Sequence, residues 1–489
     1  MPIYVPVIIS LLGGLLLPLF RFRSRRARSV YVELITLATS VCVGVILARH
    51  GADTLVLLRM TDEFTLALKV DGLSMVFMGL IGFLWPLATL YAFEYMAHEE
   101  RENAFFTFYT LSYAVTLLVA MSANLFTMYV FYECLTLVTL PLVTHKKDAS
   151  SIYAGRKYLC YSIGGAALGF IGLIFLSWFG GTTSFSLGGV LNPALIAGHE
   201  DTLRLVFVIA FVGFSAKAAI FPLQAWLPLA SVAPTPVTAL LHAVAVVKTG
   251  AFAAIRLTYY SFGTAFLSGT WAQTAVLILT AFTILYGSVM AVKEQHLKRR
   301  LAYSTVSNLN YVLFAAALMT QAGMVGAMTH LVFHGIMKIT LFYCAGAILI
   351  KTGREYVQDM RGFYRVMPFT TVIFTIAGLA LTGVPPLAGF ISKWNIITAA
   401  SDVGGLGATC GMVALILSAV LTAVYLVYPS ATMLFMPLDA SNAPLAMKKA
   451  DPSLLMKLPL VILTIAIIAL GMFSVPLVEF FTNVAMGLV

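Results

Sequence analysis

The sequence predicts an all-α, polytopic membrane protein with about fourteen transmembrane helices. The chain of 489 residues has a mean hydropathy of +0.95, and only 10% of its residues are charged. A soluble domain of ordinary composition carries about 25% charged residues. Apolar runs of about eighteen residues or more recur from one end of the chain to the other, which is typical of membrane-spanning helices. Composition and run length therefore indicate an integral membrane protein.

The apolar runs define the expected spans in chain order. The first run has no basic segment before it, and five arginines follow it at 21–28, so it is expected to be a retained span and not a cleaved signal peptide. The spans are expected at 2–20, 30–48, 72–93, 105–121, 124–143, 158–180, 203–221, 236–258, 265–291, 301–319, 323–350, 368–400, 407–436 and 458–482.

Basic residues set the expected orientation. If the arginine-rich loop at 21–28 faces the cytoplasm, most of the 30 Lys and Arg residues lie in loops on that side, as the positive-inside rule requires. An even number of spans then places both termini outside, in the inner (plasma) membrane of the cell. The net charge of +10 reports this topology and contact with anionic lipid, not nucleic acid. The basic residues expected outside are Arg49, Arg59, Lys69, Arg204 and Arg256.

No cofactor or metal is expected in the chain. None of the five cysteines forms a Cys-x-x-Cys pair, so neither an iron–sulfur cluster nor a structural zinc is indicated. Neither a Gly-x-Gly-x-x-Gly string nor a P-loop string occurs. The sequence thus shows no nucleotide or redox chemistry and no active site of its own.

Ionisable side chains inside the predicted spans are the candidate functional residues. Each such charge costs roughly 2.5–3.5 kcal/mol at the centre of a membrane helix, so five together cost on the order of 10 kcal/mol. That cost favours a proton pathway over five unrelated structural roles. The residues are one acid, four lysines and three histidines: Glu133, Lys217, Lys248, Lys338, Lys393, His242, His330 and His334.

Each candidate also has a structural interpretation. Glu133 could satisfy a neighbouring helix, and Lys217 could extend its ammonium to the interface. Lys248 could form a static ion pair, and His242 could be an ordinary core histidine. A further set, His330, His334 and Lys338, recurs every four residues, so its members lie on one helical face over about 12 Å. They form either a proton wire or a polar seam between packed helices.

Two predicted spans contain helix breakers at membrane depth. The segment after Lys217 carries Pro222, Pro228, Pro234 and Pro236. The twelfth span contains Gly-Val-Pro-Pro-Leu-Ala-Gly at 383–389, just before Lys393. Proline removes a backbone donor and clashes with the preceding turn, and unwound backbone in a membrane is found where it lines a cavity or is buried in protein. We therefore expect broken helices in spans 7 and 12, each beside a buried lysine.

These strings resemble a known family. The stretch Lys-Ala-Ala-Ile-Phe-Pro-Leu-Gln-Ala-Trp-Leu-Pro from Lys217, with Ala-Pro-Thr-Pro-Val after it, closely resembles the antiporter-like subunits of respiratory complex I, of Mrp sodium/proton antiporters and of energy-converting membrane hydrogenases. Phe-Tyr-Glu ending at Glu133, the 330–346 stretch and the 383–393 stretch resemble further motifs of that family. The likeness covers roughly residues 70–435.

The resemblance implies two inverted five-helix repeats, at 105–258 and 265–436. They would be flanked by N-terminal helices at 1–104 and a C-terminal helix at 437–489. It also implies roles: Glu133 and Lys217 as a coupling pair, Lys248 as the central relay and Lys393 as the exit-side lysine. The histidines and Lys338 would connect the two halves.

The resemblance also implies membrane-subunit partners, with protons as the transported species. Lys393 and the chain length are most similar to the D subunit of Mrp antiporters or its hydrogenase counterpart. Leu229 departs from the pattern, since many relatives carry an acid just after Trp-Leu-Pro.

The expected function is proton translocation by one subunit of a larger assembly. Two other functions stay open at this stage: an autonomous secondary transporter, and the membrane subunit of a quinone- or hydrogen-linked oxidoreductase. A scaffold that has lost pumping is disfavoured by the full set of buried ionisable residues. The residues do not decide whether sodium moves, in which direction protons move, what supplies the energy, or which subunits are the partners.

Overall fold

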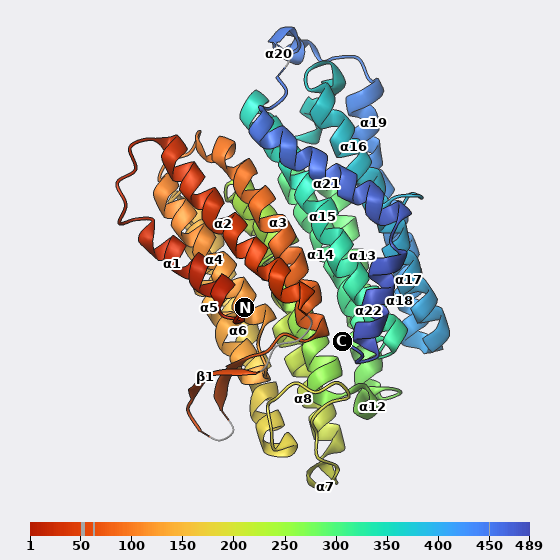
Figure 1. Cartoon of the computed structure of the whole chain (residues 1–489). Coiled ribbons are helices and arrows are strands. Elements are labelled where there is room, and N and C mark those ends of the chain that lie inside the picture. The colour runs from red at the N-terminus through yellow and green to blue at the C-terminus, as the bar shows by residue number, and fades with distance from the viewer. Residues whose placement is uncertain (50–53, 62–63, 449) are drawn as a thin grey trace.

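The computed structural model describes residues 1–489 except 50–53, 62–63 and 449. It is an elongated bundle of helices that run along a common direction (Figure 1). The helices of the N-terminal third lie on one side, and those after residue 270 lie on the other. Each predicted span corresponds to a helix or to a broken pair of helices, so the all-α, polytopic fold is confirmed.

The N-terminal part contains six long helices, and polar side chains begin several of them. The side chains of Ser24, Asp71, Asn124 and Asp148 each accept a hydrogen bond from the backbone of the first helical turn that follows. Such N-caps satisfy backbone donors that a helix start leaves unpaired. The helices are α1 (Val5–Leu16), α2 (Arg25–Ala48), α3 (Gly72–Met96), α4 (Glu102–Ala120), α5 (Leu125–Val143) and α6 (Ala149–Gly180).

The middle of the chain is broken into short pieces. After the surface turn α7 (Pro193–Ile196), α8 (Glu200–Ser215) stops inside the bundle, and residues 216–225 are not helical. The proline-rich segment then forms α9 (Trp226–Leu229) and a single 3-10 turn. The next span consists of α10 (Thr235–Ala243), α11 (Val246–Ile255), a π-helical segment (Arg256–Phe262) and α12 (Thr264–Leu267).

The C-terminal part repeats the pattern of long helices with one further break. Helix α16 ends at Thr382 and α17 begins at Ala388, where the glycine- and proline-rich string lies. The elements are α13 (Trp271–Lys293), α14 (Leu297–Ala317), α15 (Gln321–Thr352), α16 (Pro368–Thr382), α17 (Ala388–Val403), α18 (Gly405–Thr422), α19 (Tyr428–Phe435), α20 (Ala443–Lys448), α21 (Leu454–Met472) and α22 (Val475–Ala485).

Ten helices in the described part of the chain are long and apolar enough to cross a membrane. The remaining predicted spans are shorter or more polar. Breaks shorten α8, α16 and α17, and α14 carries polar residues along its length. The last predicted span, 458–482, is divided into α21 and α22 around Ser474.

The core of the bundle is the span that contains Lys248 together with α15. The apolar window of 235–262 is 100% buried and that of α15 is 89% buried, against 28% for α2. Helix α15 packs on α10, α14 and α17, while α21 and α22 run along its other side (Figure 1). The two spans that hold most of the candidate residues therefore have protein on nearly every side.

One element was not expected. A two-stranded antiparallel hairpin, β1 (Leu55–Arg59) and β2 (Thr65–Leu68), connects α2 to α3. Its second strand is held against the bundle, because the Ala67 backbone N–H donates to the Thr127 hydroxyl at 3.0 Å. The segment is rich in leucine and too short to span a membrane, and such short apolar runs do not distinguish strand from helix.

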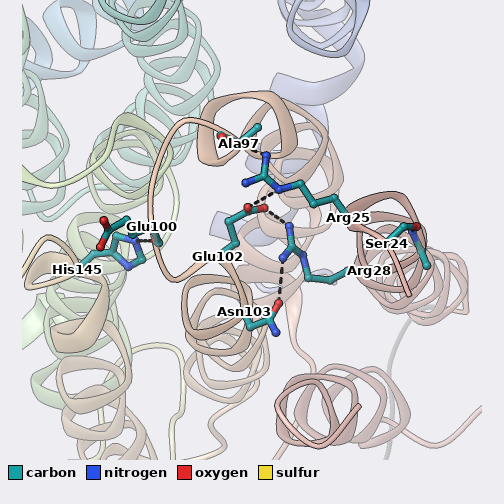
Figure 2. Close-up of polar contacts among 9 residues, drawn as sticks. Ser24, Arg25, Arg28, Ala97, Glu100, Glu102, Asn103 and His145 are labelled. Atoms are coloured by element: carbon teal, nitrogen blue, oxygen red, sulfur yellow. Dashed lines mark hydrogen bonds and ion pairs between the residues drawn. The ribbon is translucent and has the colours of Figure 1, made fainter. Parts of the chain in front are cut away.

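The loops expected on the cytoplasmic side share one end of the bundle, which we call the basic end (the loops at 17–24, 97–101, 144–148, 294–296 and 353–367). Figure 2 shows how two of them are tied together. Arg25 and Arg28 both bind the Glu102 carboxylate, and Arg28 also donates to the Asn103 side chain at 2.9 Å. His145 Nε2 lies 2.8 Å from the Glu100 carbonyl oxygen. These contacts fix the starts of α2 and α4 side by side.

Candidate functional site

The first predicted pair is formed in the structure. Lys217 Nζ lies 3.9 Å from Glu133 Oε1, with the lysine fully buried and the acid 24% exposed. The ammonium also donates to the Tyr132 carbonyl and lies 3.4 Å from the centre of the Tyr132 ring. Since the lysine reaches α5 from the non-helical segment after α8, the break places this charge beside the acid.

Side chains from elsewhere stabilise that break. The Trp226 indole donates to the Ala216 carbonyl at 2.9 Å, and the Asn310 amide donates to the Ala219 carbonyl at 3.4 Å. Both carbonyls belong to the segment that no longer pairs within a helix, and such groups need partners when they are buried. The Pro-rich string, through its tryptophan, thus stabilises the unwound backbone next to Lys217.

Lys248 contacts the other half of the molecule. Its Nζ lies 2.7 Å from His334 Nδ1 on α15, and both side chains are fully buried. Lys248 sits just after a third break, at 244–245 between α10 and α11, which the sequence analysis missed because no proline marks it. The predicted span 236–258 corresponds to the candidate span Thr235–Phe262, and the break inside it lies where the central lysine begins its helix.

Gly250 brings the first and second lysines together. A Cβ at Gly250 would lie 2.5 Å from the Ala218 nitrogen and 3.0 Å from the Lys217 Cβ. The α11 backbone therefore packs directly on the unwound segment that carries Lys217. This close approach requires the absence of a side chain, and it packs the backbone just after Lys248 against the backbone that carries Lys217.

Along α15 the row continues toward Lys393. The His330 and His334 rings lie 5.7 Å apart and nearly parallel, at 22°. His330 Nδ1 lies 2.9 Å from the Ser392 hydroxyl, and the next residue is Lys393. Lys393 Nζ donates to the Leu381 and Thr382 carbonyls at 2.8 and 2.9 Å, so it satisfies the carbonyl groups left by the end of α16.

The last two candidates lie nearer the basic end. Lys338 Nζ donates to the Leu301 carbonyl at 2.9 Å and to the Ser304 hydroxyl, both on α14. His242 packs on the Phe342 ring at 4.8 Å, and neither of its ring nitrogens has a hydrogen-bond partner among the described residues. Seven of the eight predicted residues are thus buried, and Glu133 is 24% exposed beside Lys217.

Three buried charges were missed or misplaced by the sequence analysis. Arg256, expected on the outer side at the end of the span 236–258, is fully buried in the π-helical segment, where it binds both carboxylate oxygens of Asp71 at 2.6 Å. Lys298, expected in a loop, is 6% exposed. Glu33 lies in α2 with one carboxylate oxygen buried and without a hydrogen-bond partner in the described structure. Their positions near span ends concealed them, because end residues fold inward against neighbouring loops.

The described residues contain no group of three or more His, Cys, Asp or Glu side chains placed to hold a metal ion. The arrangement instead offers a row of titratable groups: Glu133, Lys217, Lys248, His334, His330 and Lys393. The fold and these residues together define a class of protein, a polytopic helical membrane protein with a row of mostly buried ionisable side chains.

Comparison with known proteins identifies the family. A family profile described as NADH:quinone oxidoreductase/Mrp antiporter, TM, matches residues 122–423, and one described as NADH-Ubiquinone oxidoreductase (complex I), chain 5 N-terminus, matches residues 60–106. The first match covers more than half of the chain. The chain belongs to this family of antiporter-like membrane subunits.

Curated relatives come from both kinds of complex. NADH-quinone oxidoreductase subunit N of Desulforudis audaxviator is 31% identical over 420 residues, covering 83% of this chain and 82% of the relative. Subunit L of the Mycobacterium tuberculosis enzyme is 35% identical over 365 residues, covering 73% of this chain and 56% of the relative. Na(+)/H(+) antiporter subunit A1 of Staphylococcus haemolyticus is 30% identical, covering 83% and 52%. The chain thus spans little more than half of the last two relatives.

Solved structures show the same fold. The archaeal membrane-bound sulfane sulfur reductase superposes with a TM-score of 0.83 at 21% identity, covering 99% of this chain and 96% of that one. The Mrp complex from Dietzia sp. gives 0.83 at 23% identity, covering 99% and 52%. The narrower resemblance to the Mrp D subunit stays a prediction.

Proposed function

We propose that this chain is the proton-translocating membrane subunit of a multi-subunit complex of the Mrp-antiporter or complex I type. The observation that carries the proposal is a series of contacts. Glu133 pairs with Lys217, α11 packs on the segment that carries Lys217, and Lys248 contacts His334, which leads through His330 and Ser392 toward Lys393. The named relatives are subunits of such complexes, which supports partner subunits in the same membrane. An autonomous transporter and a subunit with its own redox centre are not favoured by these relatives.

The proposed mechanism is electrostatic. Glu133, when ionised, holds Lys217 protonated, and a change of charge at this pair alters the proton affinity of Lys248. Two unit charges about 7 Å apart at an effective dielectric constant of about 20 interact by roughly 2 kcal/mol, and one pKa unit corresponds to about 1.4 kcal/mol. Such a change is enough to move a proton between neighbouring sites.

The lysine–histidine contact supplies the transfer step. A protonated Lys248 donates to His334 Nδ1, and passing the proton leaves a neutral amine and an imidazolium. The opposite nitrogen, Nε2, is buried without a hydrogen-bond partner among the described residues, so it is placed to release a proton onward through water. His330, Ser392 and Lys393 extend the same route.

Orientation and internal symmetry belong to the same proposal. The basic end faces the cytoplasm, both termini lie outside, and the protein resides in the plasma membrane. Two inverted repeats, at 105–258 and 265–436, are supported by the breaks near Lys217 and Lys393, since each range contains a broken span with a buried lysine. Whether sodium accompanies protons is not decided by these residues.

Substitution of Lys248 tests the proposal. Lys248→Ala is expected to reduce proton movement by the assembled complex in membrane vesicles by about tenfold or more. Without this titratable site the barrier to proton transfer should rise by more than about 1.4 kcal/mol, which corresponds to a factor of ten. Lys248→Arg is expected to do the same, because guanidinium keeps its proton. Proton flux is followed with a pH-sensitive dye, and subunit abundance is measured by blotting. Wild-type flux from the arginine variant would exclude proton acceptance by this residue.

A further inference from the structure

Two loops at the basic end are joined where α14 begins. The Leu297 N–H donates to the Glu355 carbonyl at 2.8 Å, and the Val357 N–H donates to the Gln295 carbonyl at 3.1 Å. This pairing fixes the side chains of His296 and Glu355 face to face, with Nε2 and Oε2 3.7 Å apart. The loop before α14 is therefore held in a defined conformation by these contacts and is not a simple solvent-exposed connection.

Exposure falls along three ionisable side chains at this place. The Glu355 side chain is 40% exposed, that of His296 is 15% exposed, and Lys298 is 6% exposed. All three line a small, partly open cavity of about 10 Å³, which is about the space of one water molecule. His296 Nδ1 is buried and lacks a hydrogen-bond partner in the described structure. The three groups thus form a graded entrance from solvent to the interior.

The inner end of this entrance lies next to the proposed row. Lys298 Nζ donates to the Ala233 carbonyl at 3.1 Å, just before α10, the helix that carries His242. Lys338 Nζ binds the Leu301 carbonyl and the Ser304 side chain, which lie three and six residues beyond Lys298 on α14, roughly 5–9 Å along the helix. His242 is within electrostatic range of both Lys298 and Lys338.

The charge environment suits a proton acceptor at His296. Burial lowers the pKa of His296, and the neighbouring Glu355 carboxylate acts in the opposite direction. The imidazole is therefore neutral near pH 7 and free to accept a proton. The charged groups that act on His296 or Lys298 from the surrounding elements are Glu355, Glu294, Arg299, Lys146 and Glu99.

We propose that Glu355, His296 and Lys298 form the proton mouth of the relay at the basic end, delivering protons to Lys338 past His242. A proton passes from the Glu355 carboxyl to His296 Nε2, and one leaves Nδ1 for a water molecule and then the Lys298 amine. Only protons move, so no electron donor is required. This inference rests on the proposed function, because a proton mouth can act only if the row itself conducts protons.

The test uses conservative substitutions in the assembled complex. His296→Gln and Glu355→Gln are each expected to lower proton flux by roughly 10²-fold, with the loss greatest when the pH at the basic end is high and protons there are scarce. Lys298→Arg keeps the bond to Ala233 and the positive charge but cannot release its proton, and it is expected to give the same loss. His145→Gln is the matched control (Figure 2), because His145 is a buried histidine at the same end whose contacts are the Glu100 carbonyl and the Phe105 ring and not the proposed entrance. That variant should stay within about twofold of wild type.

The outcomes separate this inference from the proposed function. If Glu133→Gln stops flux in the same vesicles while the His296, Glu355 and Lys298 variants conduct normally, the mouth is wrong and the relay stands. If Glu133→Gln conducts normally, the proposed function itself fails. An equal loss of proton flux in the His145→Gln control would indicate a general effect on the loops and would also contradict the proposed proton mouth. Should His296→Gln not accumulate, Lys298→Arg decides.

Discussion

Buried charges in this protein differ in the partners that surround them, and the partners indicate the role. Lys248 faces the His334 imidazole, and Lys393 faces two backbone carbonyls. Such ammonium groups gain little from staying charged, so they can exchange protons. Arg256 is different, because Asp71 binds it at two points and the Tyr260 ring lies 4.5 Å away. This pair is a fixed anchor between the start of α3 and the span that holds Lys248.

The anchor should contribute to stability in a pH-dependent way. Asp71→Asn is expected to lower the free energy of unfolding by about 3–5 kcal/mol, because it leaves a buried guanidinium without its counter-charge. Burial raises the pKa of the Asp71 carboxyl, but Arg256 and the bonds from Ser74 outweigh it and lower the pKa overall. The pair's contribution is therefore fully present above about pH 4 and is lost as pH falls further.

Thermal unfolding in detergent at neutral and acid pH measures this effect. Asp201→Asn serves as control, since Asp201 is 80% exposed in a surface pair with Arg204, and its melting temperature should match wild type. An Asp71→Asn protein that melts at the wild-type temperature at pH 7 would show that the anchor is dispensable.

Helix breaks accompany the buried lysines along the chain. Lys217 follows the end of α8, Lys248 follows the break at 244–245, and Lys393 donates to the last carbonyls of α16. A helix end in a membrane leaves carbonyl groups that need donors, and the negative end of the helix dipole favours a cation. The break before α17 therefore makes room for the charge of Lys393 and also stabilises it, whereas Lys248 lies in the first turn of α11 and takes its partner, His334, from α15.

Proline and glycine predicted two of these breaks correctly, at 222–236 and 383–389. The break at 244–245 could not be predicted, because Ala-Val-Ala-Val-Val is an ordinary apolar sequence. Its cause is tertiary: α10 and α11 pack against different neighbours, α15 and α8 among them. A prediction from local sequence cannot include such a tertiary constraint.

The contact at Gly250 gives a direct test of the link between two breaks. Gly250→Ala is expected to reduce both transport and melting temperature, because the added Cβ would meet the Ala218 nitrogen at 2.5 Å and force α11 away from the segment carrying Lys217. The matched control is Gly164→Ala in α6, where nothing lies within 4 Å of a Cβ. The control should be neutral or slightly stabilising, by about 0.5–1 kcal/mol. Equal behaviour of the two variants would refute a tight α11 contact.

For the molecule as a whole, sequence predicted the number and order of spans well, because bilayer thickness fixes the length of apolar runs. It also identified the buried ionisable residues by type. It did not predict which of them touch: the contact of Lys248 with His334 joins residues 86 positions apart. It placed Lys298 in a loop and Arg256 on the outer side at the end of its span, because hydropathy cannot tell an exposed charge from one that folds inward to a partner.

The row that results runs between helices, from α5 through the unwound segment, α11 and α15 to α17. Its members belong to both proposed repeats, and α15 bridges them with two histidines. In the proposed function, a path of this form couples an event at one acid to a lysine on the far side of the bundle. The central claim is therefore that the negative charge of Glu133 controls the whole row.

Substitution of Glu133 tests that claim most directly. Proton flux by the assembled complex is measured in membrane vesicles for Glu133→Gln, Glu133→Asp, Lys217→Met and the double variant Glu133→Gln with Lys217→Met, with abundance checked by blotting. Glutamine keeps the shape but lacks the charge that holds the lysine's proton, so flux should fall to background. Aspartate should retain a reduced flux, and the double variant should be no worse than either single variant. Near-normal flux from Glu133→Gln at normal abundance would contradict the account and leave Glu133 as a packing residue.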